Sequence, residues 1–394
     1  MLDLSALRAD TPGVQHVIHV NNAGAALMPK PVIDAITGHI MLEAERGGYE
    51  AAELRKEAIQ GFYQSTAELL NTTADHIAAT ANATDAYSRA LSSIPFERGD
   101  VIVTTINDYV SNQIAFLSLQ KRFGVKVVRA VDDPLGGVSV NDMAQKIKTL
   151  RPKLVAVTHI PTNSGLIQPV EAIGQLCQEY DVFYLVDACQ SVGQLPVDVT
   201  QIHCDFLTAT CRKFLRGPRG MGFLYVSDNV LASKLSPLFI DLRGASWESA
   251  DKFTPVSTAQ RFEDWEFPYA LVLGAAEANR YALNIGLGNI ARRNTELIEL
   301  LSTQLADLPA VRLLDQGERL ASILTLVTER RSAVEIKNAL QAERINTSLS
   351  PREAAILDFD HKGMTTTALR ISPHYYNTED EIHTLVETLK RILA

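Results

Sequence analysis

Two stretches of this 394-residue chain decide its fold: FYLVDACQSVG (183–193) and FLTATCRKFLRGPRGMGFLYV (206–226). In each stretch an apolar run ends in polar residues. Asp187 and Gln190 follow the first run, and Lys213 follows the run that opens the second, beside glycine-rich turns. Short apolar runs bounded by turn residues are typical of strands buried on both faces of a sheet. The two stretches therefore predict buried strands with reactive side chains at their ends.

Runs of the same kind alternate with helical patterns from about residue 100 onward. The apolar runs cover residues 101–105, 125–130, 154–160, 183–188, 206–211 and 221–226. Helical patterns such as 111–123 and 170–180 lie between them. This alternation predicts an α/β fold with a mostly parallel sheet covered by helices on both faces. Because ligands of such sheets bind at the carboxyl ends of the strands, residues at those ends are the candidates for a site.

The flanking regions predict further helices and a second, smaller unit. Residues 30–70 form a helical pattern that is broken near 47–48, and after residue 280 helices alternate with strands. Capping boxes beginning at Ser332 and Thr378 predict two helix starts. We predict an N-terminal arm, a large domain and a smaller α+β domain, at residues 1–20, 21–280 and 281–394.

Lys213 and Asp187 are the strongest candidates for chemistry. A lysine is a nucleophile only when its pKa falls below about 10.4, and burial beside a cation such as Arg212 lowers it. Asp187 follows the apolar residues FYLV, where a carboxylate needs a partner. A lysine that forms a Schiff base and an aspartate that pairs with a pyridinium nitrogen indicate pyridoxal phosphate, with Gln190 near the ring hydroxyl. A surface lysine and a helix-capping aspartate are the simpler alternatives.

Other residues suggest binding of a phosphate and a carboxylate. TANATDAYSRAL (80–91) predicts a helix start whose N–H groups and Thr84 hydroxyl could cradle a phosphate, although it is also an ordinary capping sequence. Tyr109 could lie on a cofactor ring or simply pack. Arg370, inside the strand-like ALRIS, could hold an amino-acid carboxylate or a structural salt bridge. The chain has neither a P-loop nor a dinucleotide fingerprint.

Composition argues against several classes of protein. The net charge of -9, without a basic run, disfavours nucleic acid and anionic membranes as partners. No stretch approaches the roughly 20 apolar residues of a membrane-spanning helix, and the N-terminus lacks a secretory pattern. The four cysteines and nine histidines show no metal-ligand spacing. We expect a cytoplasmic protein without a metal site.

These features together resemble the class V aminotransferase and cysteine desulfurase family of fold type I pyridoxal-phosphate enzymes, from NNAGAALMP (21–29) to ALRISPHYYNTEDEI (368–382). The resemblance implies a seven-stranded, mostly parallel sheet in the large domain, a homodimer and an amino-acid substrate. It implies that Lys213, Asp187 and Tyr109 are catalytic. The implied cofactor-binding residues are Ala83, Thr84, Asn163, Asp187, Gln190, Thr210, Arg212 and Lys213, and the implied substrate-binding residues are Arg370 and Asn22.

Two departures from the family pattern narrow the expected reaction. The stretch INTSLSPREAAILDFDHKG (345–363) lacks the cysteine that receives sulfur in cysteine desulfurases. RFEDWEFP (261–268) stands where the family has a threonine that reaches the partner subunit's phosphate. RKFLRGPRG (212–220) resembles the carbon–sulfur lyases of the family, so we expect a lyase without a persulfide cysteine. An aminotransferase, an epimerase resembling isopenicillin N epimerase, and a non-enzymatic cofactor-binding scaffold or regulator are the alternatives.

Overall fold

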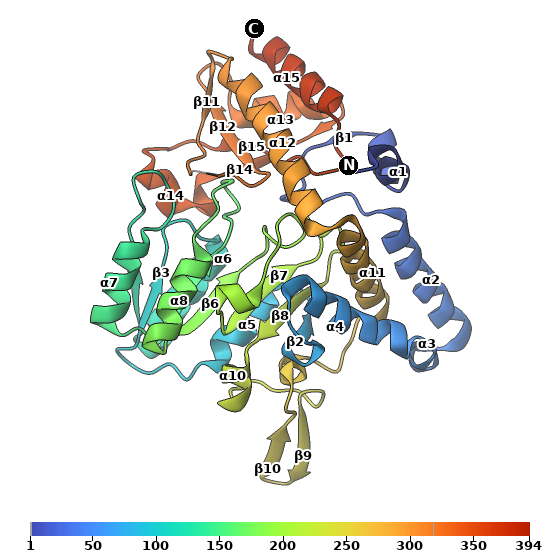
Figure 1. Cartoon of the computed structure of the whole chain (residues 1–394), viewed down its shortest axis with the longest axis vertical. Coiled ribbons are helices and arrows are strands. Elements are labelled where there is room, and N and C mark those ends of the chain that lie inside the picture. The colour runs from blue at the N-terminus through green and yellow to red at the C-terminus, as the bar shows by residue number, and fades with distance from the viewer. Residues whose placement is uncertain (1, 318) are drawn as a thin grey trace.

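A seven-stranded sheet forms the centre of the larger unit in the computed structural model, which describes residues 2–317 and 319–394 (Figure 1). In spatial order the strands are β2 (Ile77–Thr80), β8 (Gly222–Val226), β7 (Phe206–Thr210), β6 (Phe183–Asp187), β5 (Leu154–Thr158), β3 (Val101–Thr104) and β4 (Lys126–Arg129). β8 runs antiparallel to both of its neighbours, and the other pairs are parallel. The predicted seven-stranded, mostly parallel sheet is confirmed.

Helices cover both faces of this sheet, because successive strand residues point to opposite sides. Tyr184 and Val186 of β6 belong to one core, and Leu185 belongs to the other. The first core includes residues of α4 (Lys56–Leu70), α7 (Val140–Leu150), α8 (Val170–Tyr180) and α11 (Tyr269–Ile285), and the second includes residues of α5 (Ala83–Ser93) and α6 (Val110–Phe123). Burial on both faces is the reason that the strands are continuous apolar runs.

The helical pattern predicted for residues 30–70 is confirmed, including its interruption. It forms α2 (Lys30–Arg46), α3 (Gly48–Leu54) and α4. Gly47 separates the first two helices with a φ of 96°, a backbone conformation that glycine adopts without steric cost. Both predicted capping boxes are also present, at the starts of α13 (Ala333–Ala342) and α15 (Glu379–Leu393).

The smaller unit is a four-stranded antiparallel sheet with helices, and a short segment near the start of the chain packs on it. Its strand order is β11 (Val311–Leu313), β12 (Leu324–Thr328), β15 (Ala368–Ile371) and β14 (Ser348–Ser350), packed with α12 (Leu287–Ala306), α13 and α15. Near the N-terminus, β1 (Ile18–His19) pairs in parallel with β13 (Ile345–Asn346), and Val20 lies in the core of the smaller unit. The predicted domain boundaries remain predictions; residues 18–20 pack on the smaller unit, whereas Leu7 lies in the core of the larger one.

Some elements were not expected from the sequence. The strand β2 is short, and β9 (Ala245–Ser249) and β10 (Lys252–Pro255) form a hairpin that projects from the large unit (Figure 1). The remaining helices are α1 (Leu4–Ala9), α9 (Val199–Ile202), α10 (Asp228–Ala232) and α14 (Ile356–His361). The hairpin exposes Trp247 and Phe253, so its residues lack the buried apolar pattern on which the strand predictions depended.

Candidate active site

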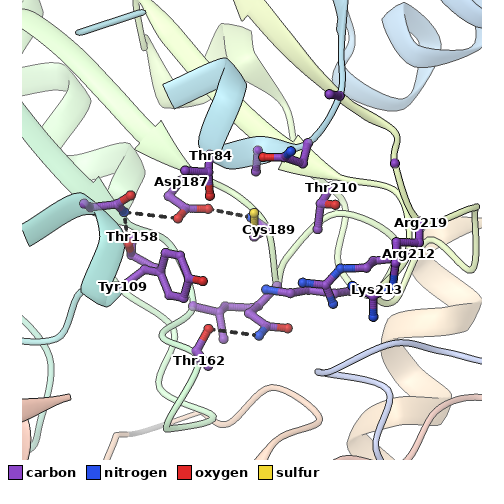
Figure 2. Close-up of a pocket in the computed structure, with 17 residues that line it drawn as sticks. Thr84, Tyr109, Thr158, Thr162, Asp187, Cys189, Thr210, Arg212, Lys213 and Arg219 are labelled. Carbon is purple, nitrogen blue, oxygen red and sulfur yellow. Dashed lines mark hydrogen bonds between the residues drawn. The ribbon is translucent and has the colours of Figure 1, made fainter. Parts of the chain in front are cut away.

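A cavity of about 290 Å³ lies where the parallel strands of the large sheet end (Figure 2). The segments that follow β2, β3, β5, β6 and β7 all contribute to it, because the carboxyl ends of strands running in one direction meet at one edge. The cavity is lined by these predicted site residues: Ala83, Thr84, Tyr109, Asp187, Gln190, Thr210, Arg212 and Lys213. The structure therefore brings together most of the side chains that the sequence singled out.

Asp187 is a buried carboxylate at the end of β6. Its Oδ1 accepts a hydrogen bond from the backbone N–H of Cys189 at 2.9 Å, and its Oδ2 accepts one from Asn112 Nδ2 at 3.2 Å (Figure 2). Within residues 2–317 and 319–394, no lysine, arginine or histidine forms a salt bridge with it. A buried carboxylate with neutral donors alone lacks a countercharge, which a protonated pyridine nitrogen would supply.

The amine of Lys213 lies in the turn after β7 and also faces the cavity (Figure 2). Burial lowers the pKa of Lys213, and Arg212 and Arg370 lower it further, while Cys189 and Asp187 act in the opposite direction. In the part of the chain that the structure describes, the amine has no carboxylate in salt-bridge contact. A larger fraction of this amine is therefore neutral at a given pH than for an exposed lysine, as covalent attachment to an aldehyde requires.

Two neighbouring features fix the position of the Lys213 turn. Gly193 has a φ of 87°, and a Cβ at this position would lie 2.4 Å from the backbone nitrogen of Leu215. The turn after Asp187 can therefore pack directly on the turn after Lys213 only with glycine here. The buried guanidinium of Arg216 donates to the Leu27 carbonyl at 2.8 Å and to the hydroxyl of Tyr375 at 2.7 Å.

The start of α5 and two arginines form an anion-binding corner of the cavity. Asn82 Oδ1 accepts from the N–H of Asp85 at 3.0 Å, which caps the helix and leaves the first turn facing the cavity. Arg212 and Arg219 also line the cavity, and Arg212 donates to the carbonyl of Gly24. Burial lowers the pKa of Arg212, and the charge of Arg219 adds to this effect. A helix N-terminus with two cations and the Thr84 hydroxyl fits a phosphate group.

Arg370 is a buried arginine on β15 that has no carboxylate partner among the described residues. It donates from Nη1 to the Thr162 carbonyl at 2.9 Å and from Nη2 to Asn21 Oδ1 at 3.5 Å, whereas its Nε has no partner. Burial lowers the pKa of Arg370 to about 10, and the charge of Arg212 contributes. An amino-acid carboxylate would supply the missing acceptors and the missing charge.

Gln190 lines the cavity, and one polar atom of its side chain has no hydrogen-bond partner among the described residues. Its Nε2 donates to the Ala23 carbonyl and to Thr162 Oγ1, both at 3.2 Å, while its buried Oε1 has no partner. A free carbonyl oxygen at this position can accept a hydrogen bond from a ring hydroxyl. Together with the amine of Lys213 and the uncompensated charges of Asp187 and Arg370, it shows that these residues fit pyridoxal phosphate and an amino acid.

Three predicted residues, Arg370, Asn163 and Asn22, do not line the cavity, and of these only Arg370 keeps a buried polar atom without a partner among the described residues. Asn163 donates instead to Asp358 Oδ2 at 2.6 Å. Asn22 is fully buried, and its Nδ2 donates to the carbonyls of Ser372 and His19, while its Oδ1 accepts from the Tyr376 hydroxyl. These bonds use both polar atoms of the Asn22 side chain and the amide nitrogen of Asn163 to join segments of the fold. We therefore do not assign Asn22 and Asn163 to ligand binding in the proposal below.

Several residues of the cavity were missed from the sequence. They are Asn82, Asn112, Thr158, Thr162, Cys189 and Arg219. A helical spacing of three residues after Tyr109 could have indicated Asn112, and the end of a predicted strand could have indicated Thr158. Arg219 carries no such signal, because only the folded turn between β7 and β8 brings it to the cavity.

Residues 2–317 and 319–394 contain no group of three or more histidine, cysteine, aspartate or glutamate side chains arranged to hold a metal ion. None of the helices that the structure describes is long and apolar enough to cross a membrane.

Comparison with known proteins identifies the family. Residues 18–385 match the family model described as aminotransferase class-V. A probable cysteine desulfurase of Methanothermobacter thermautotrophicus is 28% identical to this chain, covering 98% of the chain and 97% of that protein. One from Pyrococcus abyssi is 27% identical, with the same coverage of both chains.

The solved structures agree with this assignment. The structure of cysteine desulfurase from Thermococcus onnurineus NA1 is 25% identical, with a TM-score of 0.91, and covers 100% of this chain and 98% of that chain. The cystine C–S lyase C-DES has the same fold, with a TM-score of 0.86 at 23% identity over 96% of this chain and 98% of that one. The family match extends over nearly the whole chain, and the cavity fits the cofactor. The protein therefore belongs to the class V aminotransferase family and is a pyridoxal-phosphate-dependent enzyme.

Proposed function

We propose that this enzyme cleaves the carbon–sulfur bond of a cysteine-derived amino acid by β-elimination, releasing sulfur directly into solution. The observation that carries this proposal is the state of the cysteines. Cys189 is the cysteine that lines the cavity, and burial and the charge of Asp187 raise the pKa of its thiol well above the usual value. A thiol held in its protonated form is a poor nucleophile. Sulfur transfer to a protein thiolate is therefore disfavoured here.

The other cysteines support the same conclusion. Cys177, Cys204 and Cys211 are buried in the core of the large unit. Burial raises the pKa of each of these thiols. The segment 345–363, which holds the sulfur-accepting cysteine in desulfurases of this family, has no cysteine. The substrate's sulfur would accordingly leave as sulfide, persulfide or sulfenate, depending on its substituent, with pyruvate and ammonia as the other products.

The residues of the site have distinct roles in this proposal. Arg370 binds the substrate carboxylate through its unsatisfied guanidinium, and this contact orients the α-carbon toward Lys213. Lys213 Nζ would hold the cofactor and, as the base that faces the cavity, would take up the α-proton of the substrate. Pyridoxal phosphate, when bound, supplies an electron sink for the negative charge that develops at the α-carbon. Asp187 keeps the ring nitrogen protonated.

The remaining lining residues position the cofactor. Thr84, Ala83, Thr210 and Arg212 surround the corner that fits the phosphate. Tyr109 follows β3 on the same side of the cavity as Asp187 and is proposed to pack on the cofactor ring (Figure 2). Gln190 is proposed to accept a hydrogen bond from the ring hydroxyl, since its Oε1 has no other partner.

Product analysis of the cofactor-loaded enzyme tests this function. The protein is incubated separately with L-cysteine, L-cystine and an S-alkyl cysteine sulfoxide, and pyruvate, ammonia and released sulfur are measured. We expect pyruvate and reduced sulfur in equal amounts with at least one of them, and none with Lys213→Ala. Keto-acid exchange or loss of optical activity without sulfur release would instead show an aminotransferase or an epimerase. A bound cofactor without a spectral response to any amino acid would indicate a non-enzymatic role.

We also propose that the enzyme is a homodimer. Large apolar side chains are exposed on the hairpin β9–β10 and on the segment before it, namely Leu238, Phe239, Leu242, Trp247 and Phe253. Exposed apolar clusters of this kind commonly mark protein interfaces. Light scattering after size-exclusion chromatography should give twice the chain mass for the wild type and a monomer for a Phe239→Asp, Trp247→Asp double variant. A monomeric wild type at micromolar concentration would contradict the proposal.

A further inference from the structure

A second buried carboxylate, Asp108, lies behind Asp187 and outside the lining of the cavity. Its side chain accepts hydrogen bonds from five donors. They are the Thr158 hydroxyl (2.5 Å), the Tyr109 N–H (2.7 Å), Gln113 Nε2 (2.7 Å), Asn112 Nδ2 (2.9 Å) and the Thr104 hydroxyl (3.4 Å). These donors fill the roughly four acceptor positions of a carboxylate, and only the two hydroxyls among them could instead accept a hydrogen from a protonated acid. The donors therefore favour the charged form of Asp108, although burial raises its pKa.

Asn112 connects the two carboxylates. Its Nδ2 donates to Asp108 Oδ1 at 2.9 Å and to Asp187 Oδ2 at 3.2 Å. An amide NH₂ group has two hydrogens, so one hydrogen can point to each carboxylate, while Thr158 Oγ1 is a further and more distant acceptor at 3.4 Å. Asn112 is itself buried in the first turn of α6, and its side chain has few alternative positions. The orientation of Asp187 toward the cavity thus depends on a side chain that Asp108 orients in turn.

The same carboxylate also places Tyr109. The N–H of Tyr109 donates to Asp108 Oδ1, the oxygen that also accepts from Asn112. Tyr109 immediately precedes α6, so this bond fixes the chain where it enters the helix. One buried oxygen therefore bonds directly to Tyr109 and Asn112, and through Asn112 it connects Tyr109 to Asp187 at the end of β6. Hydrogen-bonded groups outside a reactive site commonly orient the residues within it in this way.

We propose that Asp108 is a positioning residue that, through Asn112, holds Asp187 in place for the ring nitrogen of the cofactor and joins Tyr109 to the same unit. This inference rests on the proposed placement of Asp187 at that nitrogen. It does not depend on which amino acid is the substrate.

Cofactor binding tests the inference without measuring turnover. Apoenzymes of the wild type and of the variants Asn112→Ala, Asp108→Asn and Asp187→Asn are titrated with pyridoxal phosphate and with pyridoxal. Visible circular dichroism of the bound cofactor is recorded in parallel. Asn107→Ala is the matched control, because Asn107 lies in the same loop but its amide donates to Asp132. Thermal unfolding of each apoenzyme shows whether the variant is folded.

The two cofactors separate contacts to the ring from contacts to the phosphate. Asn112→Ala and Asp108→Asn should weaken binding of both cofactors by a similar factor, about tenfold, as expected for one lost hydrogen bond to a charged group. Both variants should also change the circular dichroism band, while Asn107→Ala behaves like the wild type. If Asn112 acts through Asp187, the double variant Asn112→Ala, Asp187→Asn should bind no more weakly than Asp187→Asn alone.

Three outcomes would overturn the inference. Additive losses in the double variant would show that Asn112 does not act through Asp187. Wild-type affinity and dichroism in a folded Asn112→Ala or Asp108→Asn would show that the bridge does not position Asp187. No effect of Asp187→Asn would remove the proposed placement of Asp187 and the inference with it, whereas failure of the lyase reaction alone would leave these binding measurements unchanged.

Discussion

Replacing Arg370 by methionine should stabilise the empty protein and impair the enzyme. Arg370 is buried without a carboxylate partner among the described residues, and its Nε has no hydrogen bond. Methionine has a similar length and fills irregular space without a charge. The substitution therefore removes a positive charge that has no countercharge among the described residues of the empty protein. In our proposal, the substrate carboxylate supplies that countercharge when it binds.

The magnitude follows from the pKa. Burial and the charge of Arg212 lower the pKa of Arg370 from its ordinary 12.5 to about 10. At about 1.4 kcal/mol for each unit, the folded protein is destabilised by about 3 kcal/mol at neutral pH. Because the group is a base with a depressed pKa, this destabilisation is fully present below pH 10 and disappears as the pH rises from there to 12.5. In Arg370→Met, loss of the hydrogen bonds to Thr162 and Asn21 costs about 1 kcal/mol each. The free energy of unfolding of the empty protein should therefore rise by about 1 kcal/mol.

The effect on catalysis has the opposite sign and is larger. Removing one partner of a buried, hydrogen-bonded charge pair costs about 2–5 kcal/mol, which corresponds to roughly 30- to 5,000-fold in kcat/KM. Differential scanning calorimetry of the apoenzymes at pH 7 measures the first effect, and steady-state kinetics with the best substrate measures the second. A kcat/KM within threefold of the wild type would refute the role of Arg370 in binding the carboxylate. A decrease in apoenzyme stability would refute the account of its buried charge.

Three further predictions concern Lys213 and its surroundings. Lys213→Ala should abolish turnover and the covalent cofactor adduct that borohydride reduction traps, as read by mass spectrometry; a trapped adduct on another lysine would refute the assignment. Thr84→Val should weaken binding of pyridoxal phosphate about tenfold but leave binding of pyridoxal unchanged, because Thr84 acts on the phosphate; equal losses for both ligands would contradict this. Burial and Arg212 lower the pKa of Lys213, so the pH profile for covalent attachment of pyridoxal should move to higher pH in Arg212→Ala; an unchanged profile in a stopped-flow absorbance assay would contradict this.

The sequence alone predicted most of the large sheet. Six of its seven strands fall within the predicted apolar-rich runs, because burial on both faces of most of these strands leaves no regular polar alternation. The strand that was missed, β2, contains only IAAT, in which two alanines weaken the apolar signal. The hairpin β9–β10 was missed for another reason: its residues are largely exposed, so their sequence has no burial pattern.

The sequence predicted part of the candidate site because of the topology of the parallel sheet. Parallel strands end at one edge of a sheet, so the places of Asp187, Tyr109 and Asn163 after strands predict a shared pocket, and Asp187 and Tyr109 do line the cavity. The same argument failed for Asn163, which follows β5 but turns to Asp358 on α14. A strand end determines the position of the backbone, whereas the direction of a side chain depends on the partners that the fold supplies.

The sequence by itself determined the fold class, the cofactor chemistry and the residues at the strand ends, since each of these depends on local patterns of burial and turns. Only the tertiary structure decided which charges lack a partner. Arg370 has no carboxylate and Asp187 has no cation among the described residues, while Asp108 receives five donors from one side of the fold. Hydrogen bonding and charge compensation at these sites join segments more than 40 residues apart, such as Asp108 with Thr158 and Arg370 with Thr162. These two contacts follow from the packing of whole elements, whereas the other four donors to Asp108 lie within the local segment 104–113.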